Sequence, residues 1–512
     1  MQADPSDFRM SGGSCFSRNQ AGKQKNMSTE YQHLVLTENA ADKMEYKRMI
    51  SLAVEKILAS LDSGDAYKGL TPEKLRERVH TDELLPESGL GFDAVMEETA
   101  EKILPNFLRP FSTSYMAHLH SSALLESIVS ELILSTFNQS MDSWDQAPVA
   151  TEIEVEVIRH LCKLYGYGEG SDGVFTSGGS QSNLSGLLLA RDWFCNTKLH
   201  WDVKKFGLPA SYRKFRLYAS EISHFSMEKS THLMGLGYDC VVKVPVNDAM
   251  QMDADILEKL IEEDLKDGNL PFCIAATVGT TDFGSIDPLD KLAEIAKKYS
   301  LWLHADAAYG SGVILSDKYA YRVKDLALCD SITVDFHKMF LLPISCSASL
   351  VKNGKNFECL TLHADYLNRE EDEEDGYINL VDKSMQTTRR FDALKVWFSF
   401  RARGRKGWSQ IITRFMENAV YLYGQLEKSP DFEVAVKPEI SSVVFRVLPG
   451  AGAAESADDM NKRIRRKLLH EHGVVIGQTV CKGNVCLKFT LLNPLLTHEK
   501  LDELLALILS LR

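Results

Sequence analysis

The chain has 512 residues, of which 44% are hydrophobic and 25% are charged, and its formal net charge at pH 7 is −13. A chain of this length can bury a large core and form more than one structural unit without a scaffold of disulfides or metal ions. The acidic balance argues against a nucleic-acid or anionic-membrane partner, because such an interface needs a basic face.

The predicted elements divide the chain into four parts. Residues 1–26 are polar and rich in Gly and Ser, which is typical of a disordered leader, and Met27 is a plausible alternative start. Amphipathic helices such as 46–61 predict an N-terminal helical segment over 27–111. Residues 112–407 alternate short apolar strands with helices, as a mostly parallel sheet requires. Residues 408–512 predict a small α+β domain with helices at 410–426, 458–472 and from 499, and strands at 432–436, 442–448 and 487–491.

Two apolar segments of the large domain each lead to one chemically distinctive residue. Asp306 ends the strand pattern over 300–305, and Lys338 follows the pattern that begins at Ser331. Open α/β sheets build ligand sites at the carboxyl ends of their strands. A lysine amine can form a Schiff base with an aldehyde, and a carboxylate can hold a proton on a pyridine nitrogen. The pair therefore predicts a pyridoxal phosphate (PLP) pocket, against the simpler interpretations of a helix N-cap and a surface lysine.

A third segment, 172–183, has the composition of a phosphate-binding turn. It passes from a short strand through Thr-Ser-Gly-Gly-Ser-Gln-Ser-Asn into an amphipathic helix over 184–194. Such a turn presents backbone N–H groups, and Ser180 and Ser182 add hydroxyl donors. It has neither the dinucleotide-binding nor the nucleotide-triphosphate glycine spacing. Alone it is weak evidence, because a helix cap rich in Ser and Gly serves structure more often than ligand binding, but the order of strand, turn, Asp and Lys favours a PLP enzyme.

Blocks of sequence between about 115 and 446 resemble the group II PLP-dependent decarboxylases, relatives of glutamate and aromatic amino-acid decarboxylases. The blocks that carry the resemblance are 138–144, 176–183, 223–226, 276–281, 306–309 and 335–338. The resemblance implies an α/β fold of type I, a mostly parallel sheet with a small C-terminal domain, and PLP as the cofactor. It also implies a homodimer with the active site at the subunit interface.

The resemblance assigns roles to individual residues. Lys338 matches the Schiff-base lysine, and Asp306 matches the partner of the pyridine nitrogen. Gly179 and Ser180 match the phosphate-binding turn, and His337 matches a further phosphate contact. His224 matches the imidazole that stacks on the cofactor ring, although a core histidine is the alternative. The two remaining cofactor-binding positions, which match residues beside the ring, are Thr277 and Ala308.

The acidic stretch 363–377 lacks apolar periodicity and predicts a surface loop. A solvated connector is the simpler interpretation. In the resembled family, a loop at this place closes over the site and carries a tyrosine that helps to protonate the substrate carbon after carbon dioxide leaves. Tyr377 is the candidate for this catalytic role beside Lys338 and His224, and Tyr366 is the second choice.

The substrate prediction depends on a closer resemblance. Segments 115–120, 201–209, 280–288 and 377–395 look like bacterial L-2,4-diaminobutyrate decarboxylases and the lysine decarboxylases of siderophore pathways. We expect decarboxylation of L-2,4-diaminobutyrate to 1,3-diaminopropane for siderophore or polyamine synthesis. Lysine or ornithine, and glutamate, aspartate or aromatic substrates, are alternatives, followed by an aminotransferase or a non-catalytic PLP-fold protein. Arg389 either contacts a carboxylate or the lid, or pairs with Asp392.

The remaining signals concern redox state and location. Ten cysteines occur without CxxC pairs or a zinc-binding pattern, which indicates reduced thiols and no metal. No apolar run reaches the roughly 18 residues of a membrane helix, and the chain start lacks a secretory apolar region. We therefore expect a cytoplasmic enzyme that binds a small amino acid.

Overall fold

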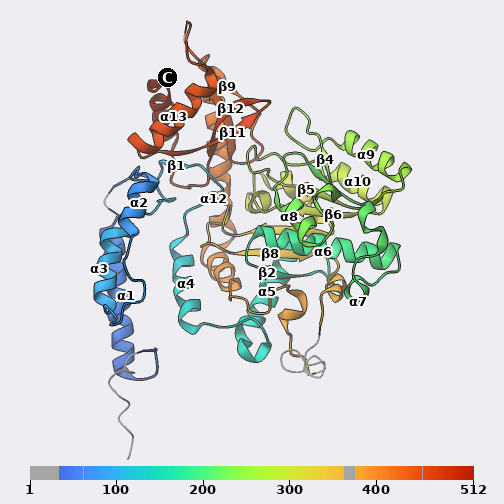
Figure 1. The fold of residues 1–512 in the computed structure, drawn as a ribbon, viewed down its shortest axis with the longest axis horizontal. Coiled ribbons are helices and arrows are strands. Elements are labelled where there is room, and N and C mark those ends of the chain that lie inside the picture. Colours follow the sequence, from blue (N-terminus) through green and yellow to red (C-terminus); the bar gives the residue numbers. More distant parts are fainter. Residues whose placement is uncertain (1–33, 62, 363–374, 453) are drawn as a thin grey trace, which may run out of the picture. The chain divides into compact units, whose positions relative to one another are not determined.

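A computed structural model describes residues 34–61, 63–362, 375–452 and 454–512 (Figure 1). The predicted leader 1–26, Met27 and Tyr366 lie outside the described residues. The described residues form two compact units: residues 34–61 with 78–105, and residues 63–77 with the described residues from 106 to 512. In the first unit, helix α1 (Ala40–Ala59) packs on α3 (Phe92–Lys102). Two ion pairs join these helices, between Arg48 and Asp93 at 2.7 Å and between Lys56 and Glu97 at 2.6 Å.

The second unit contains a seven-stranded sheet in the order β2-β8-β7-β6-β5-β3-β4. The strands from β7 to β4 in that order run parallel, and β8 is antiparallel to both of its neighbours. This confirms the predicted α/β class with a mostly parallel sheet. The strands are β2 (Asp172–Thr176), β3 (Phe215–Ser220), β4 (Val241–Val244), β5 (Leu270–Thr277), β6 (Trp302–Asp306), β7 (Ser331–Asp335) and β8 (Ser347–Val351).

Helices cover both faces of this sheet. One face packs against α5 (Pro148–Leu164), α9 (Ala254–Lys266), α10 (Leu289–Tyr299) and the first part of α12 (Ala393–Lys428). The other face packs against α6 (Gly179–Lys198) and α8 (Ser226–Leu233). Figure 1 shows α6 lying across the strands. The helix predicted over 184–194 is longer in the structure, because α6 begins at Gly179 in the glycine turn and ends at Lys198.

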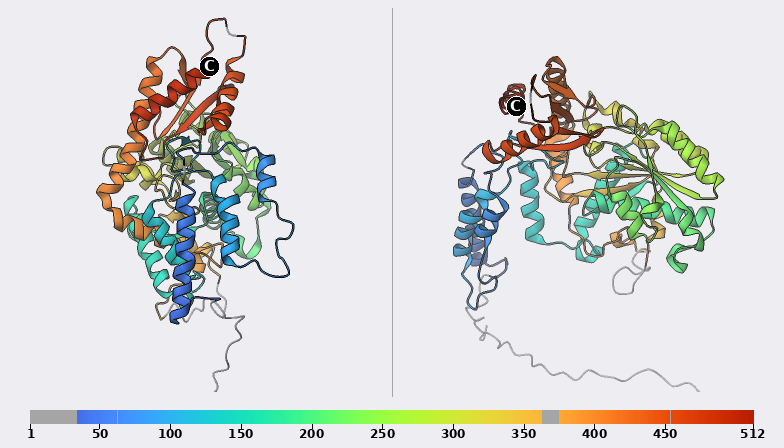
Figure 2. Two further views of the ribbon diagram at one scale, coloured as in Figure 1. Left: turned by 90° about the vertical axis from the view of Figure 1, so that its left-hand side faces the viewer. Right: turned by 45° about the horizontal axis from the view of Figure 1, so that its top comes forward.

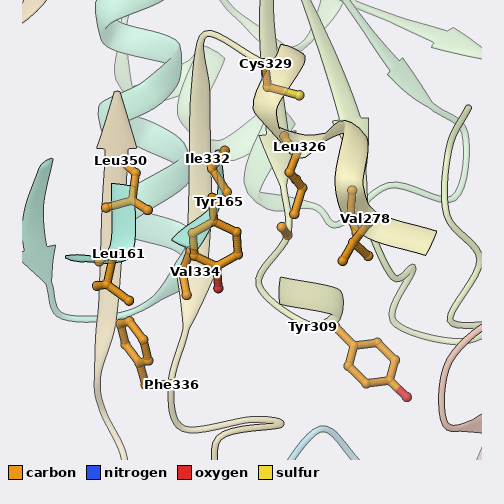
Figure 3. Packing of buried hydrophobic residues seen from close by; sticks show 14 of the residues in the cluster. Leu161, Tyr165, Val278, Tyr309, Leu326, Cys329, Ile332, Val334, Phe336 and Leu350 are labelled. Atoms are coloured by element: carbon orange, nitrogen blue, oxygen red, sulfur yellow. The ribbon is translucent and has the colours of Figure 1, made fainter. Parts of the chain in front are cut away.

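Strand alternation gives the two faces different chemistry. Successive side chains of a strand point to opposite faces, so Ile332 and Val334 of β7 join the apolar core with α5. Figure 3 shows Tyr165 of α5 lying against these two residues and Leu161 lying beside Leu350 of β8. The other β7 positions, Ser331, Thr333 and Asp335, are buried and polar and lie on the α6 face. The sheet therefore presents an apolar face to α5 and a polar strip to α6.

A second sheet, of five strands in the order β1-β11-β12-β10-β9, combines β1 with four strands from the C-terminal part of the same unit. The red helices in Figure 2 include α13 (Ala457–Glu471) and α14 (His498–Ser510), whose apolar residues share a core with this sheet. The predicted C-terminal elements are all found, but β11 was missed. The strands are β1 (Tyr115–Met116), β9 (Phe432–Val434), β10 (Ser442–Val447), β11 (Val475–Cys481) and β12 (Asn484–Thr490).

The other α-helices of the described residues are α2 (Pro72–Val79), α4 (Leu125–Phe137) and α7 (Val203–Phe206). The predicted helix over 410–426 is part of the longer α12, which contains non-helical backbone at Gly404 (φ 64°, ψ 173°). The part of α12 that follows Gly404 therefore corresponds to the predicted helix, but it begins several residues before residue 410. Within the described part of the chain, no helix combines the length and apolar composition needed to cross a membrane.

Candidate active site

A cavity of about 490 Å³ lies where the carboxyl ends of β5, β6 and β7 meet the N-terminus of α6. This is the edge at which open α/β sheets build their ligand sites. All of the predicted site residues except Tyr377 line it: Gly179, Ser180, His224, Thr277, Asp306, Ala308, His337 and Lys338. The chain thus brings together residues that are up to 159 positions apart, from Gly179 to Lys338.

Lys338 and His337 lie just after β7, beside the buried carboxylate of Asp335. Lys338 Nζ is 3.2 Å from Asp335 Oδ2, and His337 Nε2 is 3.6 Å from the same oxygen. The other oxygen, Asp335 Oδ1, is buried and has no hydrogen-bond partner among the described residues. The hydroxyl of Ser121 donates to the backbone carbonyl of Lys338 at 2.7 Å. The lysine is therefore held at the cavity wall with its amine directed to an acidic group.

The turn into α6 approaches the same carboxylate. A Cβ atom at Gly179 would lie 2.7 Å from Asp335 Oδ2, so only a glycine allows this approach. The first turn of a helix leaves backbone N–H groups without intrahelical partners, and the helix dipole favours an anion there. Ser182, in contrast, is buried between Thr176 and Ser347, whose hydroxyl oxygens lie 2.6 Å and 2.8 Å away. Of the two predicted hydroxyl donors, only Ser180 lines the cavity.

Asp306 is buried at the end of β6 and is held by two hydrogen bonds. The backbone N–H of Ala308 donates to Oδ1 at 3.2 Å, and the side-chain amide of Asn183 donates to Oδ2 at 2.9 Å. A carboxylate has about four lone-pair sites, so these two bonds leave acceptor capacity on the cavity side. Asp306 can therefore pair with a protonated ring nitrogen in the cavity.

Thr277 ends β5 and is the register partner of Asp306 on the neighbouring strand β6. Its backbone N–H donates to Asp287 Oδ2 at 2.7 Å, whereas its hydroxyl is buried and has no partner within the described chain. Burial raises the pKa of Asp287 to about 6 despite the backbone hydrogen bonds that it accepts from Met252 and Thr277. An unpaired buried hydroxyl on a cavity wall is the state expected where a bound polar group completes it.

His224 projects from the loop between β3 and α8. Its Nδ1 atom lies 2.8 Å from the hydroxyl of Ser226 and accepts the backbone N–H of Ser226 at 3.2 Å. Burial and the positive charge of Lys338 lower the pKa of His224, and the charge of Asp306 opposes this only in part. The imidazole is therefore neutral at pH 7, and a neutral ring is suited to stacking on a heteroaromatic group.

The remaining candidates lie elsewhere. Tyr377 is 41% exposed and packs against Trp144 with 4.9 Å between ring centroids and 53° between the ring planes, outside the cavity lining. Arg389 pairs with neither the cavity nor Asp392. Its guanidinium lies 3.0 Å from Glu154 in a buried ion pair, so it contacts a carboxylate of the chain instead of Asp392, and the stretch 363–374 of the expected lid lies outside the described residues.

Two residues of the site were missed by sequence reasoning. Asn183 lines the cavity and bonds to Asp306, and His304 lies behind Asn183. The strand period would have indicated His304, because residues 304 and 306 of β6 point to the same face. No comparable pattern indicated the contact between Asn183 and Asp306, because the Asn183 side chain reaches Asp306 only through the packing of α6 on the sheet.

The donor set suits PLP. A helix N-terminus with Ser180 can hold an anionic group, Asp306 can hold a ring proton, and Lys338 offers an amine. The unpaired oxygens of Thr277 and Asp335 leave polar positions for a ligand to complete. No group of three His, Cys, Asp or Glu side chains in the described residues is arranged to hold a metal ion.

Comparison with known proteins decides the family. Residues 72–448 match the pyridoxal-dependent decarboxylase conserved domain. The chain belongs to the pyridoxal-dependent decarboxylase family. It is therefore a PLP-dependent amino-acid decarboxylase, as predicted, and its cofactor is PLP.

The chain is 38% identical to an L-2,4-diaminobutyrate decarboxylase of Acinetobacter baumannii, over 94% of this chain and 95% of the relative. It is 32% identical to the enzyme of that name from Rhizobium meliloti (strain 1021), over 93% and 94%. Among solved structures, it is similar to the glutamate decarboxylase domain of a diaminobutyrate–pyruvate transaminase and L-2,4-diaminobutyrate decarboxylase from Vibrio parahaemolyticus. That match has a TM-score of 0.86 and 33% identity, and covers 94% of this chain and 98% of the other.

Proposed function

We propose that this enzyme decarboxylates L-2,4-diaminobutyrate to 1,3-diaminopropane and carbon dioxide. The observation that carries the proposal is the 38% identity to a diaminobutyrate decarboxylase over 94% of the chain, since it extends through every segment that lines the cavity. Lysine and ornithine are the next candidates. Siderophore or polyamine synthesis is the proposed use of the diamine.

The proposed residue roles follow from the cavity. When bound, PLP supplies an electron sink that accepts the electrons of the breaking Cα–carboxylate bond. Lys338 holds the cofactor through its amine, and Asp306 keeps a proton on the ring nitrogen. Gly179, Ser180 and His337 bind the phosphate.

The side chains around the ring have supporting roles. His224 stacks on one side of it, and Thr277 and Ala308 contact it. Leu119 and Ile344 also line the cavity and limit solvation of the substrate carboxylate, which favours its departure as neutral carbon dioxide. Tyr377, near the stretch 363–374, remains the proposed lid tyrosine that helps to protonate the substrate carbon.

The proposal includes the assembly and location of the enzyme. We propose a homodimer with the active site at the interface, and the exposed apolar side chains on α4 support a covered face there: Leu125, Ile128, Val129 and Phe137. The free state of the described cysteines supports a cytoplasmic location. We propose the domain limits 27–111, 112–407 and 408–512, which keep each of the two large sheets of the second unit mainly in one domain.

A substrate panel tests the function. Carbon dioxide and amine release are measured with diaminobutyrate, ornithine, lysine, glutamate, aspartate and aromatic amino acids, for the wild type and for Lys338→Ala, with PLP added. The matched control is Lys298→Ala, which removes an exposed lysine paired with Glu258 at 2.8 Å. We expect fast turnover of diaminobutyrate, lost in Lys338→Ala and retained in Lys298→Ala.

Other outcomes would change the conclusion in defined ways. Preferential turnover of lysine or ornithine would keep the diamine class and change the substrate. Turnover of acidic or aromatic substrates alone would refute the diamine proposal. Dependence on a keto-acid acceptor would indicate an aminotransferase, and PLP binding without product release would indicate a non-catalytic protein.

A further inference from the structure

A buried chain of hydrogen bonds lies behind Asp306. Asn183 donates from Nδ2 to Asp306 Oδ2 at 2.9 Å, and Asn183 Oδ1 lies 3.0 Å from His304 Nε2. His304 Nδ1 lies 2.8 Å from Ser331 Oγ, to which Trp302 Nε1 donates at 2.9 Å. Asn183, His304 and Ser331 are at most 1% exposed. The chain of bonds thus runs from the two strands β6 and β7 through α6 to the carboxylate.

One assignment of protons satisfies every group in this chain. An ionised carboxylate only accepts hydrogen bonds, so the amide nitrogen of Asn183 must face Asp306 and its oxygen must face His304. His304 then carries its proton on Nε2, and its Nδ1 accepts the hydroxyl proton of Ser331. The indole N–H of Trp302 can only donate, so it donates to the Ser331 oxygen. Every donor along the chain therefore points toward Asp306.

Asn183 also connects Asp306 to His224. Its second amide hydrogen is directed to Ser226 Oγ at 2.9 Å, and that oxygen lies 2.8 Å from His224 Nδ1. Because the backbone N–H of Ser226 also donates to Nδ1, this nitrogen is an acceptor and the proton of His224 is on Nε2. A single amide group therefore touches the carboxylate and, through one hydroxyl, the imidazole of the cavity.

The packing of α6 accommodates this arrangement. A Cβ atom at Gly186 would lie 2.6 Å from His304 Nδ1 and 3.1 Å from Ser331 Oγ. Residues three apart in a helix lie on the same face, so Asn183 and Gly186 face the sheet together. A glycine inside a helix is unfavourable relative to alanine. Here it leaves room for the His304 ring, which the sheet and α6 enclose completely.

We propose that Asn183 and His304 are positioning residues for the PLP site. Together they hold the Asp306 carboxylate in its orientation toward the ring nitrogen, and Asn183 fixes the proton of His224 on Nε2. The inference depends on the proposed roles of Asp306 and His224. It adds a reason why α6, whose N-terminus faces the cavity, must also pack closely on β6 and β7.

The test compares variants that keep shape but remove hydrogen bonds. His304→Phe and Asn183→Leu remove them, and His304→Gln restores an amide donor at the place of Nε2. Ser349→Ala is the control, because Ser349 is buried in the same sheet and its hydroxyl has no partner among the described residues. The readouts are the PLP dissociation constant from fluorescence titration, the visible absorbance of the bound cofactor, and kcat and KM separately.

We expect about ten- to a hundredfold weaker PLP binding in Asn183→Leu, the range that a hydrogen bond to a charged group supports. His304→Phe should show a smaller loss in the same direction, with an altered cofactor absorbance and a lower kcat at nearly unchanged KM. His304→Gln should recover most of the wild-type values, and Ser349→Ala should retain them. The double variant should lose less than the sum of the single losses, because both changes break one chain.

Wild-type PLP affinity, absorbance and kcat in folded His304→Phe and Asn183→Leu would overturn the inference. If either variant fails to fold, Ser331→Ala supplies the test, since it removes only the far hydroxyl, and an unchanged spectrum and affinity there would have the same meaning. The proposed function is tested separately by Asp306→Asn and Lys338→Ala. If those two variants behave like the wild type, the proposed roles of Asp306 and Lys338 are wrong. If those two variants lose activity but the Asn183 and His304 variants do not, the proposed positioning network is wrong.

Discussion

Gly186→Ala should destabilise the enzyme, although alanine is the better helix former. In an unobstructed helix, this substitution stabilises by about 0.5–1 kcal/mol. At Gly186, however, the new Cβ would lie 2.6 Å from Nδ1 and 2.7 Å from Cε1 of His304. Neither the ring nor the backbone of α6 has free space, and overpacking of this kind costs about 1–3 kcal/mol. We expect a net loss of about 0.5–2 kcal/mol and weaker PLP binding.

The matched control is Gly424→Ala in α12, where the added Cβ has no neighbouring atom within 4 Å. It should stabilise by about 0.5–1 kcal/mol. Urea and thermal unfolding of both variants, with PLP in excess and without PLP, measure the two shifts. Opposite signs are expected. A Gly186→Ala variant as stable as Gly424→Ala would refute the close packing of α6 against His304.

Three further predictions concern other parts of the molecule. Glu154→Gln leaves Arg389 charged, buried and without its ion-pair partner. The free energy of unfolding, measured by urea titration, should therefore fall by about 3–5 kcal/mol. A fall of less than about 1 kcal/mol, as expected for the exposed control Lys298→Ala, would contradict this. Burial lowers the pKa of His304 from its ordinary value of 6.5 to about 4, so the unfolded chain binds a proton between these values that the folded protein does not. The free energy of unfolding of the wild type should therefore rise by up to about 3 kcal/mol relative to that of His304→Phe as pH rises from about 4 to 6.5. A difference in unfolding free energy that does not change with pH would refute the lowered pKa of His304. Phe137, which is 71% exposed on α4, should lie in the proposed dimer interface. In sedimentation experiments, Phe137→Lys should dissociate into monomers at concentrations at which the control Leu495→Lys, at a 70% exposed position, stays dimeric. Equal association of the two variants would place the interface elsewhere.

The sequence predicted the residues that carry the chemistry of the site better than the residues that hold them in position. Asp306 and Lys338 follow apolar strands, and parallel strands bring their carboxyl ends to one edge, so their proximity follows from periodicity alone. The glycine turn before α6 was recognisable from its composition, because small and hydroxyl-bearing residues before a helix present hydrogen-bond donors to an anion. The role of Asn183 was not, since it depends on the rotation of α6 against the sheet.

Two corrections show what periodicity omits. The sequence offered Asp392 or an unspecified carboxylate as partners of Arg389, and the partner is the carboxylate of Glu154, which is 235 positions away. Strand β11 was missed because its burial alternates incompletely, with Gly477 and Gln478 interrupting the apolar pattern. Both features are set by long-range packing, which a local pattern does not encode.

Helix α6 explains why these parts of the site are interdependent. Its N-terminal turn approaches Asp335 through Gly179, its next turn places Asn183 against Asp306, and Gly186 admits His304 behind both. A shift of the helix along its axis would disturb all three contacts at once. Because buried hydrogen-bonded groups are costly to leave unpaired, such a shift is opposed by the whole chain of bonds from Trp302 to Asp306. The rigidity needed at the anion-binding turn and the orientation needed at the carboxylate therefore have one structural source.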